Sequence, residues 1–337
     1  MRIQLIGLGN VGKNLVALIE EKQGFLLSNG IPLRVVSVSD SNGTAHSNSG
    51  LDLNQILKRK KDNWKGFSKY ETGYSALDAI KNIRSDAVVE LTPSNPSGEP
   101  GLTHIKSALE CKKNVVTANK TPFVLAYEDL LDIARKNQVR LLYEATVAAH
   151  LPVFCLIESC FKADKIVRIE GILNATTNFI IGQIERGRTF QEALTQAIKE
   201  GWAETDYSDD VDGVDSARKV VILANAFFKK GARLEDVKIK GIRNIGKSID
   251  RAKQLHKKVK LMCCISRKGT NVEMSVTPRL IAKNDPLATV NAGDMAMKLV
   301  FETSRQVFVS AQFAGVKQTA YAVLNDLIKV AQLNHSC

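Results

Sequence analysis

The stretch MRIQLIGLGNVGKNL, residues 1–15, contains a short apolar strand, three glycines and the start of a helix. Gly7, Gly9 and Gly12 have the G-x-G-x-x-G spacing, which indicates dinucleotide binding when strand, glycines and helix come in this order. The first glycine permits a tight turn, the second lets the backbone approach a pyrophosphate, and the third lets the helix pack closely on the strand. The phosphates would lie at the positive end of the helix. The stretch therefore predicts a nucleotide-binding fold.

The residues that follow alternate between strand and helix patterns as far as residue 150. We expect strands at 32–40, 85–95, 114–122 and 139–146, and helices at 103–113 and 127–137. This alternation predicts an α/β fold with a Rossmann-type, doubly wound parallel sheet. Ligands bind at the carboxyl ends of the strands in such sheets. Lys120 and Glu144 lie at or near two of those ends.

After Pro152 the pattern becomes that of an α+β domain. Amphipathic helices are expected at 189–201 and 214–228, and two adjacent strands at 258–268 and 270–281 with Gly269 in the turn between them. We predict three parts. They are an NAD(P)-binding domain at 1–150, a substrate-binding and dimerisation domain at 151–310, and a C-terminal helix within 311–337 that packs back on the nucleotide domain.

Two features make opposite predictions about the dinucleotide. Asp40 ends the second strand, where a carboxylate would hold the ribose 2′-hydroxyl of NAD. The basic cluster Lys58, Arg59, Lys60 and Lys61 could instead bind the 2′-phosphate of NADP, or form a solvated helix face. The sequence thus leaves NAD and NADP open.

The composition is ordinary for a soluble globular protein and argues against several classes of function. The chain has 337 residues, 44% of them hydrophobic, and a net charge of +12. The lysines are spread along the chain without a known nucleic-acid-binding motif, so we expect an anionic small molecule and no nucleic acid as partner. No apolar run reaches about 18 residues, and the N-terminus is not a signal peptide, so no membrane partner is expected. The six cysteines have neither paired nor zinc-binding spacing, which favours a cytoplasmic protein with reduced thiols.

The run TDYSDDVDGVDSARK, residues 205–219, concentrates five aspartates in this basic chain. One interpretation is a solvated loop that leads into a helix, because Asp favours helix starts. A calcium loop is excluded: with Gly213 at its sixth position, the bidentate ligand at the twelfth would be Lys219. A third interpretation is a catalytic cluster, since Asp215 and Lys219 are four residues apart and share a helix face.

Together these motifs resemble the homoserine dehydrogenases over almost the whole chain. The motifs that come in that family's order are GLGNVG, SDSNG, VVELTPSN, VVTANKTP, YEATVAAHLP, ILNATTNFI, DVDGVDSARK and TAYAVLNDL. The combination of TANK-x-P with D-x-x-G-x-D-x-x-x-K is specific. The resemblance implies NAD(P)-dependent interconversion of L-aspartate 4-semialdehyde and L-homoserine, on the route to threonine, methionine and isoleucine. It also implies a homodimer joined through sheets of the second domain.

The resemblance further implies roles for particular residues. Lys219 matches the principal acid–base lysine, which would donate a proton to the carbonyl oxygen as hydride arrives, and Lys120 matches a second lysine that binds or protonates substrate. A lysine suits acid–base work if burial or a cationic neighbour lowers its pKa. Glu204, Asp210 and Asp215 match the acids around the amino group and hydroxyl of the substrate. The residues expected to bind the dinucleotide are Gly7, Gly9, Asn10, Val11, Gly12, Asp40, Lys58, Thr92 and Gly315.

Members of the family also bind a monovalent cation near YEATVAAH. Glu144 matches the side-chain ligand, with the carbonyl oxygens of Val147 and Ala149 beside it. A carboxylate with carbonyls suits a hard ion such as Na⁺ or K⁺. The alternative is a buried glutamate bonded to backbone N–H groups.

The sequence departs from the family at several glycines. Ala148, His150 and Ala175 stand where glycine is usual, Trp202 replaces a common tyrosine, and Ala311-Gln312-Phe313-Ala314-Gly315 replaces a glycine-rich segment near the nicotinamide. A Cβ at such a position can displace a ligand or exclude a positive φ. Phe313 could therefore pack on the nicotinamide ring or block it. Two alternatives stay open. One is a nucleotide-binding sensor that has lost turnover, which would not need both lysines and the acids together. The other is another amino-acid dehydrogenase.

Overall fold

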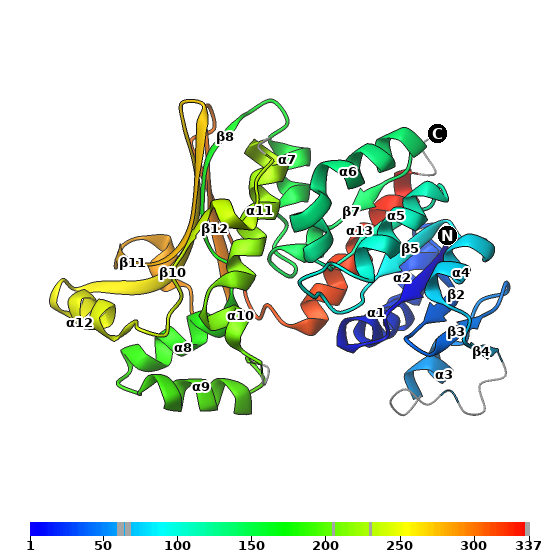
Figure 1. The fold of residues 1–337 in the computed structure, drawn as a ribbon, viewed down its shortest axis with the longest axis horizontal. Coiled ribbons are helices and arrows are strands. Elements are labelled where there is room, and N and C mark those ends of the chain that lie inside the picture. The colour runs from blue at the N-terminus through cyan, green and yellow to red at the C-terminus, as the bar shows by residue number, and fades with distance from the viewer. Residues whose placement is uncertain (59–63, 65–68, 204–205, 229–230, 334–337) are drawn as a thin grey trace. The chain divides into compact units, whose positions relative to one another are not determined.

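The structure is a computed structural model that describes residues 1–58, 64, 69–203, 206–228 and 231–333. The chain forms two compact units (Figure 1). Residues 1–150 and 316–337 make up the first unit, and residues 151–315 make up the second.

The described residues of the first unit form a seven-stranded sheet in the order β4-β3-β2-β1-β5-β6-β7. Five neighbouring strands are parallel: β2 (Arg34–Ser39), β1 (Arg2–Ile6), β5 (Ala87–Glu90), β6 (Asn114–Thr117) and β7 (Leu141–Leu142). The predicted Rossmann-type sheet is therefore confirmed. Two antiparallel strands, β3 (Gly43–His46) and β4 (Tyr70–Thr72), extend it beside β2. They were not predicted, because their short polar sequences carry no apolar alternation.

Helices cover both faces of this sheet. Ile3 and Leu5 of β1 pack in one core with α1 (Asn10–Glu21) and α13 (Val316–Leu333). On the opposite face, Gln4 donates a side-chain hydrogen bond of 2.7 Å to a carbonyl of α4 (Ala76–Asn82). The other elements of this unit are α2 (Gln23–Ser28), α3 (Leu53–Lys58), α5 (Gly101–Glu110), α6 (Thr121–Asn137) and the single turn η1 (Glu144–Thr146).

The C-terminal helix α13 is an integral part of the first unit's core. Val323, Leu327 and Val330 are fully buried there, and α13 packs along α1. The boundary predicted after residue 310 lies five residues too early. Ala311 still pairs with Met295 in the other unit's sheet, and that unit continues to residue 315.

The second unit is built on a six-stranded sheet, counted over its described residues, in the order β13-β12-β8-β10-β11-β9. Its longest strands, β10 (Lys257–Lys268) and β11 (Asn271–Ala282), form the predicted hairpin, with Gly269 at φ +60° in the turn. The flanking strands are β8 (Ile166–Ile172), β9 (Val237–Ile239), β12 (Met295–Phe301) and β13 (Gln306–Ala311).

Two helices of the second unit pack on this sheet and carry candidate site residues. They are α8 (Ala175–Glu185) and α11 (Val214–Phe228), and α10 (Ser208–Val211) precedes α11. Asn174 starts α8, because its side-chain oxygen accepts a hydrogen bond of 2.8 Å from the N–H of Thr177. The remaining elements are α7 (Phe154–Cys160), α9 (Phe190–Lys199), α12 (Gly246–Gln254) and the turns η2 (Leu234–Asp236) and η3 (Pro286–Thr289).

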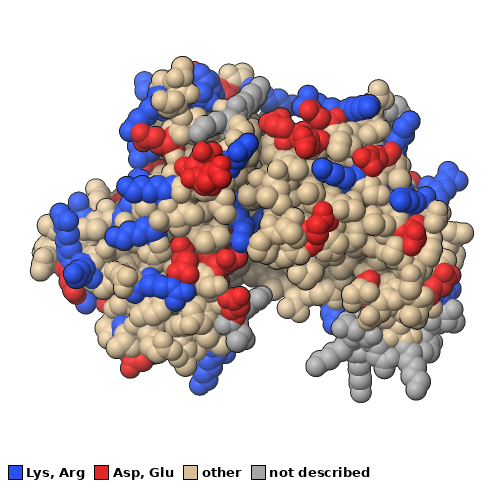
Figure 2. Space-filling view, in the orientation of Figure 1, with Lys and Arg blue, Asp and Glu red and all other residues tan. Residues whose placement is uncertain are grey.

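The structure also bears on the predictions made from composition, which concern charge, membrane spans and cysteines. Lys and Arg side chains are interspersed with Asp and Glu over the face that Figure 2 shows. Within the described ranges, no helix is both long enough and apolar enough to cross a membrane. Of the cysteines in this part of the chain, Cys111, Cys160, Cys263 and Cys264 are free thiols.

Replacing Leu327 with Ala tests the role of α13 in the core. The buried side chain would leave a cavity, so we expect the free energy of unfolding of the first unit to fall by about 2–5 kcal/mol. Tyr321→Ala on the exposed side of α13 is the control and should change it by no more than about 0.5 kcal/mol. Chemical denaturation measures both, and equal effects would contradict the assigned packing.

Candidate functional site

The glycine loop has a geometry that accepts few other residues. Gly7 has φ +92°, and a Cβ there would stand 2.6 Å from the carbonyl oxygen of Leu91. A Cβ on Gly12 would stand 2.4 Å from the carbonyl oxygen of Gly7. At Gly9, in contrast, no described atom lies within 4 Å of the Cβ position, so the backbone is open to a ligand.

Helix α1 begins directly after this opening. Asn10 and Val11 are its first residues, and Gly9, the residue before them, makes no side-chain cap. The first backbone N–H groups of the helix therefore face the open side of the loop without a capping side chain. Such a helix start favours a phosphate, because the donors and the helix dipole both attract negative charge.

Asp40 lies where β2 ends and has several hydrogen-bond donors around it. Its carboxylate accepts from the indole Nε1 of Trp64 at 2.5 Å and from the hydroxyl of Tyr70 at 2.9 Å. The N–H groups of Asn42 and Gly43 donate to it as well. Trp64 and Tyr70 stack with their ring centroids 4.8 Å apart. The carboxylate is thus fixed in place at the edge where a ribose would bind.

The other residues predicted to bind the dinucleotide are placed as follows. Thr92 follows β5 and donates both its N–H and its hydroxyl to the carboxylate of Glu90. Lys58 is the exposed last residue of α3, whereas Arg59, Lys60 and Lys61 lie outside the described residues. Gly315 directly precedes α13, and its N–H donates to the carbonyl of Phe313 at 2.8 Å.

Lys120 stands at the carboxyl edge of the first unit's sheet. It is the N-cap residue of α6 and follows β6 by three residues. Its backbone N–H is 3.4 Å from the hydroxyl of Ser94, which comes from the loop after β5. Two loops of the sheet thus meet at this lysine.

Lys219 is held by two oxygen atoms in the second unit. It lies on α11, and its Nζ is 2.7 Å from Oδ2 of Asp215 and 2.6 Å from the carbonyl oxygen of Leu173. Lys219 and Asp215 are 7% and 8% exposed, so this ion pair is buried. The predicted shared helix face is therefore a direct contact. Both partners accept hydrogen bonds from an ammonium group, which orients Lys219 as a proton donor.

Asp210 completes a cluster of two acids and one amide around this lysine. Asn174 donates through Nδ2 to Asp210 at 2.6 Å and to Asp215 at 3.0 Å, and so links the two carboxylates. Burial raises the pKa of Asp210, and the charge of Asp215 raises it further, while Asn174 and Lys219 oppose the shift. Two carboxylates held close together attract a cationic group. The third predicted acid, Glu204, lies outside the described residues.

The predicted cation ligand Glu144 is buried and forms an ion pair with a half-buried lysine. Glu144 is 8% exposed and belongs to η1, close to Val147 and Ala149, and Ala149 has φ +51°. The carboxylate of Glu144 lies 3.8 Å from Nζ of Lys329, on α13. Its N–H donates to Asp326, whose pKa burial raises to about 7. An ammonium group thus already lies beside the carboxylate that was expected to bind Na⁺ or K⁺.

The positions that depart from the family fall into different environments. Phe313 has φ +55° and is 66% exposed, so its side chain does not exclude the left-handed backbone that a glycine would adopt there. Trp202 packs against Phe179 and would contact any Cβ on Gly293. His150 is half-buried, and burial lowers its pKa. Ala148, Ala175 and Ala311 are not among the residues with positive φ.

Several residues of these clusters were not predicted from the sequence. Asn174, which joins the two acids, lies in the quoted motif ILNATTNFI, and an Asn directly before a helical pattern is an N-cap signal that could have found it. Trp64 and Tyr70 carry no such signal. Their contacts with Asp40 span 24 and 30 residues of chain.

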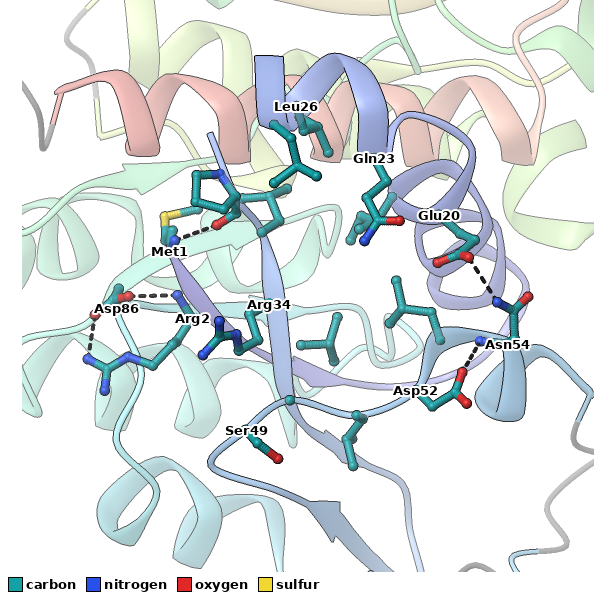
Figure 3. A pocket seen from close by; sticks show the side chains of 18 residues that line it. Met1, Arg2, Glu20, Gln23, Leu26, Arg34, Ser49, Asp52, Asn54 and Asp86 are labelled. Atoms are coloured by element: carbon teal, nitrogen blue, oxygen red, sulfur yellow. Dashed lines mark hydrogen bonds and ion pairs between the residues drawn. The ribbon is translucent and has the colours of Figure 1, made fainter. Parts of the chain in front are cut away.

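A cavity of about 750 Å³ lies at the opposite edge of the first unit's sheet (Figure 3). Arg2 and Arg34, at the amino ends of β1 and β2, line it. Because Gly7 follows the carboxyl end of β1, this cavity is not the dinucleotide site. Polar groups around it bind one another: Arg2 pairs with Asp86, and Asn54 donates to Glu20.

Comparison with known proteins identifies the family. The sequence model "Homoserine dehydrogenase" matches residues 152–328, and the model "Homoserine dehydrogenase, NAD binding domain" matches residues 7–144. The chain belongs to the homoserine dehydrogenase family.

Individual members of the homoserine dehydrogenase family are similar over nearly their whole length. The homoserine dehydrogenase of Methanocaldococcus jannaschii is 36% identical, with 98% of each chain covered. The NAD(+)-dependent homoserine dehydrogenase of Pseudomonas canavaninivorans is 35% identical, over 98% of this chain and 96% of its own. The solved structure of a hyperthermophilic archaeal homoserine dehydrogenase in complex with NADPH has a TM-score of 0.83 at 27% identity, covering 99% of this chain and 98% of its own.

Replacing Asp210 with Asn tests the electrostatics of the cluster. The folded-state pKa of Asp210 is raised above its unfolded value of about 4, so ionised Asp210 costs stability once the pH rises above that value. We expect Asp210→Asn to have an equal or higher midpoint of thermal unfolding at pH 8, and the advantage to shrink towards pH 4. The nearby Asp212 is the control: Arg243 lowers its pKa, so Asp212→Asn should be neutral or destabilising at pH 8. A loss of stability in Asp210→Asn at pH 8 would contradict the assignment.

Proposed function

We propose that this protein is an NAD(P)-dependent homoserine dehydrogenase, which interconverts L-aspartate 4-semialdehyde and L-homoserine. The observation that carries the proposal is the buried pair of Lys219 and Asp215, which Asn174 joins to Asp210. The family membership and the open glycine loop support it. Neither the sensor nor another amino-acid dehydrogenase is favoured by the comparisons.

The residues of the second unit can perform the proton half of this reaction. A bound nicotinamide dinucleotide supplies or accepts the hydride at the carbon that changes oxidation state. Lys219 donates its proton to the aldehyde oxygen as that oxygen becomes a hydroxyl, and recovers a proton from solvent afterwards. In the reverse direction the amine of Lys219 accepts the hydroxyl proton. Asp215 and the carbonyl of Leu173 hold Nζ in one orientation through both steps.

The other proposed site residues carry charges that match those of a zwitterionic substrate. Asp210 and Asp215 provide negative charge for the ammonium group, and we assign Glu204 to the same role. Lys120 provides a positive charge at the carboxyl edge of the first unit, where it would bind or protonate the substrate. A zwitterionic substrate needs both signs of charge around it.

The choice of dinucleotide depends on Asp40 and the basic cluster. Trp64 and Tyr70 hold the Asp40 carboxylate at the end of β2, which supports NAD because the ribose 2′-hydroxyl can donate to a fixed carboxylate. Lys58 and the basic residues after it support NADP, since they could neutralise a 2′-phosphate. The phosphates would lie at Gly7, Gly9 and Gly12 and the start of α1 in either case.

We also propose the assembly and location that the family suggests. Two copies would pair through the sheet of the second unit, residues 151–315, to give a homodimer. The free thiols of Cys111, Cys160, Cys263 and Cys264 support a cytoplasmic location. Sedimentation at several protein concentrations would measure the oligomeric state.

Substitution of the two lysines tests the reaction. Wild-type protein should reduce NAD or NADP when L-homoserine is added, as followed at the absorbance band of the reduced nicotinamide. Lys219→Ala should lower kcat by at least about 100-fold, because it removes the proton donor. Lys120→Ala should also impair turnover. The ratio of the rates with NAD and NADP shows whether Asp40 or the basic cluster determines the choice of dinucleotide.

Lys298→Met is the matched control, because Lys298 is a buried lysine of the same unit whose ion pairs run to Glu170 and Asp285. It should retain turnover. Near-normal kcat in both Lys219→Ala and Lys120→Ala would refute the proposed roles. Binding of the dinucleotide without any turnover of homoserine in the wild type would favour the sensor.

A monovalent cation at Glu144, with the carbonyl oxygens of Val147 and Ala149, is a further part of the proposal. The buried carboxylate supports it, and the ammonium of Lys329 is an alternative source of the same positive charge. Such an ion would have a structural role, bracing the segment that leaves the first unit near residue 150.

Salt replacement tests the ion. Activity is measured in KCl, NaCl and tetramethylammonium chloride at equal ionic strength, in the wild type and in Lys329→Met. If the ion binds, wild-type activity should rise with K⁺ or Na⁺ and Glu144→Gln should lose that response. A response that appears only in Lys329→Met would show that the lysine takes the place of the ion in the natural protein.

A further inference from the structure

Glu90 is a fully buried carboxylate to which the proposed reaction gives no role. It is the last residue of β5 and is 0% exposed. It lies at the base of the loop after β5, one of the two loops that meet at Lys120. A carboxylate in such a place is costly unless hydrogen bonds compensate it. Its partners therefore show what the carboxylate organises.

One oxygen of Glu90 fixes the loop after β5. Oε1 accepts from the N–H of Thr92 at 3.0 Å and from the hydroxyl of the same residue. The imidazole Nδ1 of His104, on α5, lies 3.8 Å from this oxygen and is the nearest group that can carry a positive charge among the contacts that the structure describes. The hydrogen bonds from Thr92 to Glu90 thus fix the start of the loop that follows β5.

The other side of Glu90 fixes the loop that carries Lys120. The hydroxyl of Thr117, at the end of β6, lies 2.8 Å from the carbonyl oxygen of Glu90 and 3.3 Å from Oε2. The same hydroxyl accepts a hydrogen bond of 3.0 Å from the N–H of Asn119. Thr117 is 0% exposed and Asn119 is 3% exposed, so water does not offer an alternative partner.

Asn119 then ties the two loops to each other. Its Oδ1 accepts from the hydroxyl of Ser94 at 2.6 Å, and its Nδ2 lies 3.4 Å from the carbonyl oxygen of Thr92. Ser94 in turn is 3.4 Å from the N–H of Lys120. A continuous path of hydrogen bonds therefore runs from Glu90 through Thr117, Asn119 and Ser94 to the backbone of Lys120.

The start of α5 packs closely against this path. A Cβ on Gly101, the first residue of α5, would stand 2.4 Å from Nδ2 of Asn119 and 3.2 Å from Oε2 of Glu90. The helix backbone therefore holds the amide and the carboxylate from a third side.

We propose that Glu90 and Thr117 are positioning residues that set the place of Lys120 in the active site. This inference rests on the role proposed for Lys120. Glu90 and Thr117 are 0% exposed, so they would act through Lys120 and not by contact with the substrate. A shift of about 1 Å in a group that binds or protonates substrate can cost on the order of 100-fold in rate. The path of hydrogen bonds prevents such a shift.

The test uses a pair of substitutions that differ by one hydroxyl. Thr117→Val keeps the shape of the side chain but leaves the N–H of Asn119 without its acceptor, whereas Thr117→Ser keeps the acceptor. We expect kcat to fall about tenfold or more in Thr117→Val and in Glu90→Gln, and to stay within about threefold of wild type in Thr117→Ser. The KM for the dinucleotide should change little in Thr117→Val.

Two further variants separate positioning from stability. In a Lys120→Met background, Thr117→Val should lower the residual rate by less than about twofold, because the group it positions is gone. Lys113→Met removes a buried lysine that precedes β6 and donates to the carbonyl of Ile83 at 2.7 Å. It should lower the unfolding midpoint at least as much as Thr117→Val does, and leave kcat unchanged below that midpoint.

The outcomes distinguish this inference from the proposed function. If Lys120→Met itself turns over normally, the role assigned to Lys120 fails. If Lys120→Met is impaired but Thr117→Val is fully active, the positioning role is overturned. It is also overturned if Thr117→Val lowers the rate by the same factor in the wild-type and Lys120→Met backgrounds. A loss confined to the KM for the dinucleotide would assign the path to cofactor binding and would overturn it as well.

Discussion

The first unit depends on the close approach of two backbone segments around the glycine loop. The Cβ positions of Gly7 and Gly12 stand 2.6 Å and 2.4 Å from backbone carbonyl oxygens. Only residues without a side chain allow β1 to end, turn and continue as α1 at this spacing. Since α1 packs along α13 and both cover the same face of the sheet, the loop also sets the position of the core on that face. Between these two contacts the backbone at Gly9 is open and the start of α1 has no side-chain cap.

The main constraint on the second unit is the burial of charged side chains. An ion pair removed from water is unfavourable unless further hydrogen bonds satisfy both partners. Asn174 and the carbonyl of Leu173 supply those bonds to Asp215 and Lys219. Asp210 stays partly uncompensated, and its raised pKa is the sign of that cost. Stability is therefore given up at the cluster to which the proposed function assigns the ammonium group of the substrate, a trade that active sites commonly show.

The features that could be predicted from the sequence are those encoded over short distances. The strand, glycines and helix at 1–15, the parallel strand order that β/α alternation implies, and the pairing of Asp215 with Lys219 all depend on neighbouring residues. The antiparallel strands β3 and β4 escaped prediction because their sequences are short and carry no apolar alternation. The partners of Asp40 and the link from Asn174 to Asp215 escaped because they join residues 24 to 41 positions apart. No local pattern specifies which side chain will meet another at such separations. The domain boundary was misplaced for a related reason, since the pairing of Ala311 depends on a strand that precedes it by more than ten residues.

The place of α13 in the chain has a consequence for biosynthesis. The first unit begins at the N-terminus, is interrupted by residues 151–315, and receives α13 only afterwards. During translation the whole second unit has therefore emerged before the last helix of the nucleotide-binding core exists. Domains generally fold as units while the chain is made, the N-terminal one first. Here residues 1–150 expose the apolar face that α13 will cover until residues 316–333 have been made, so the inserted unit can complete its core first.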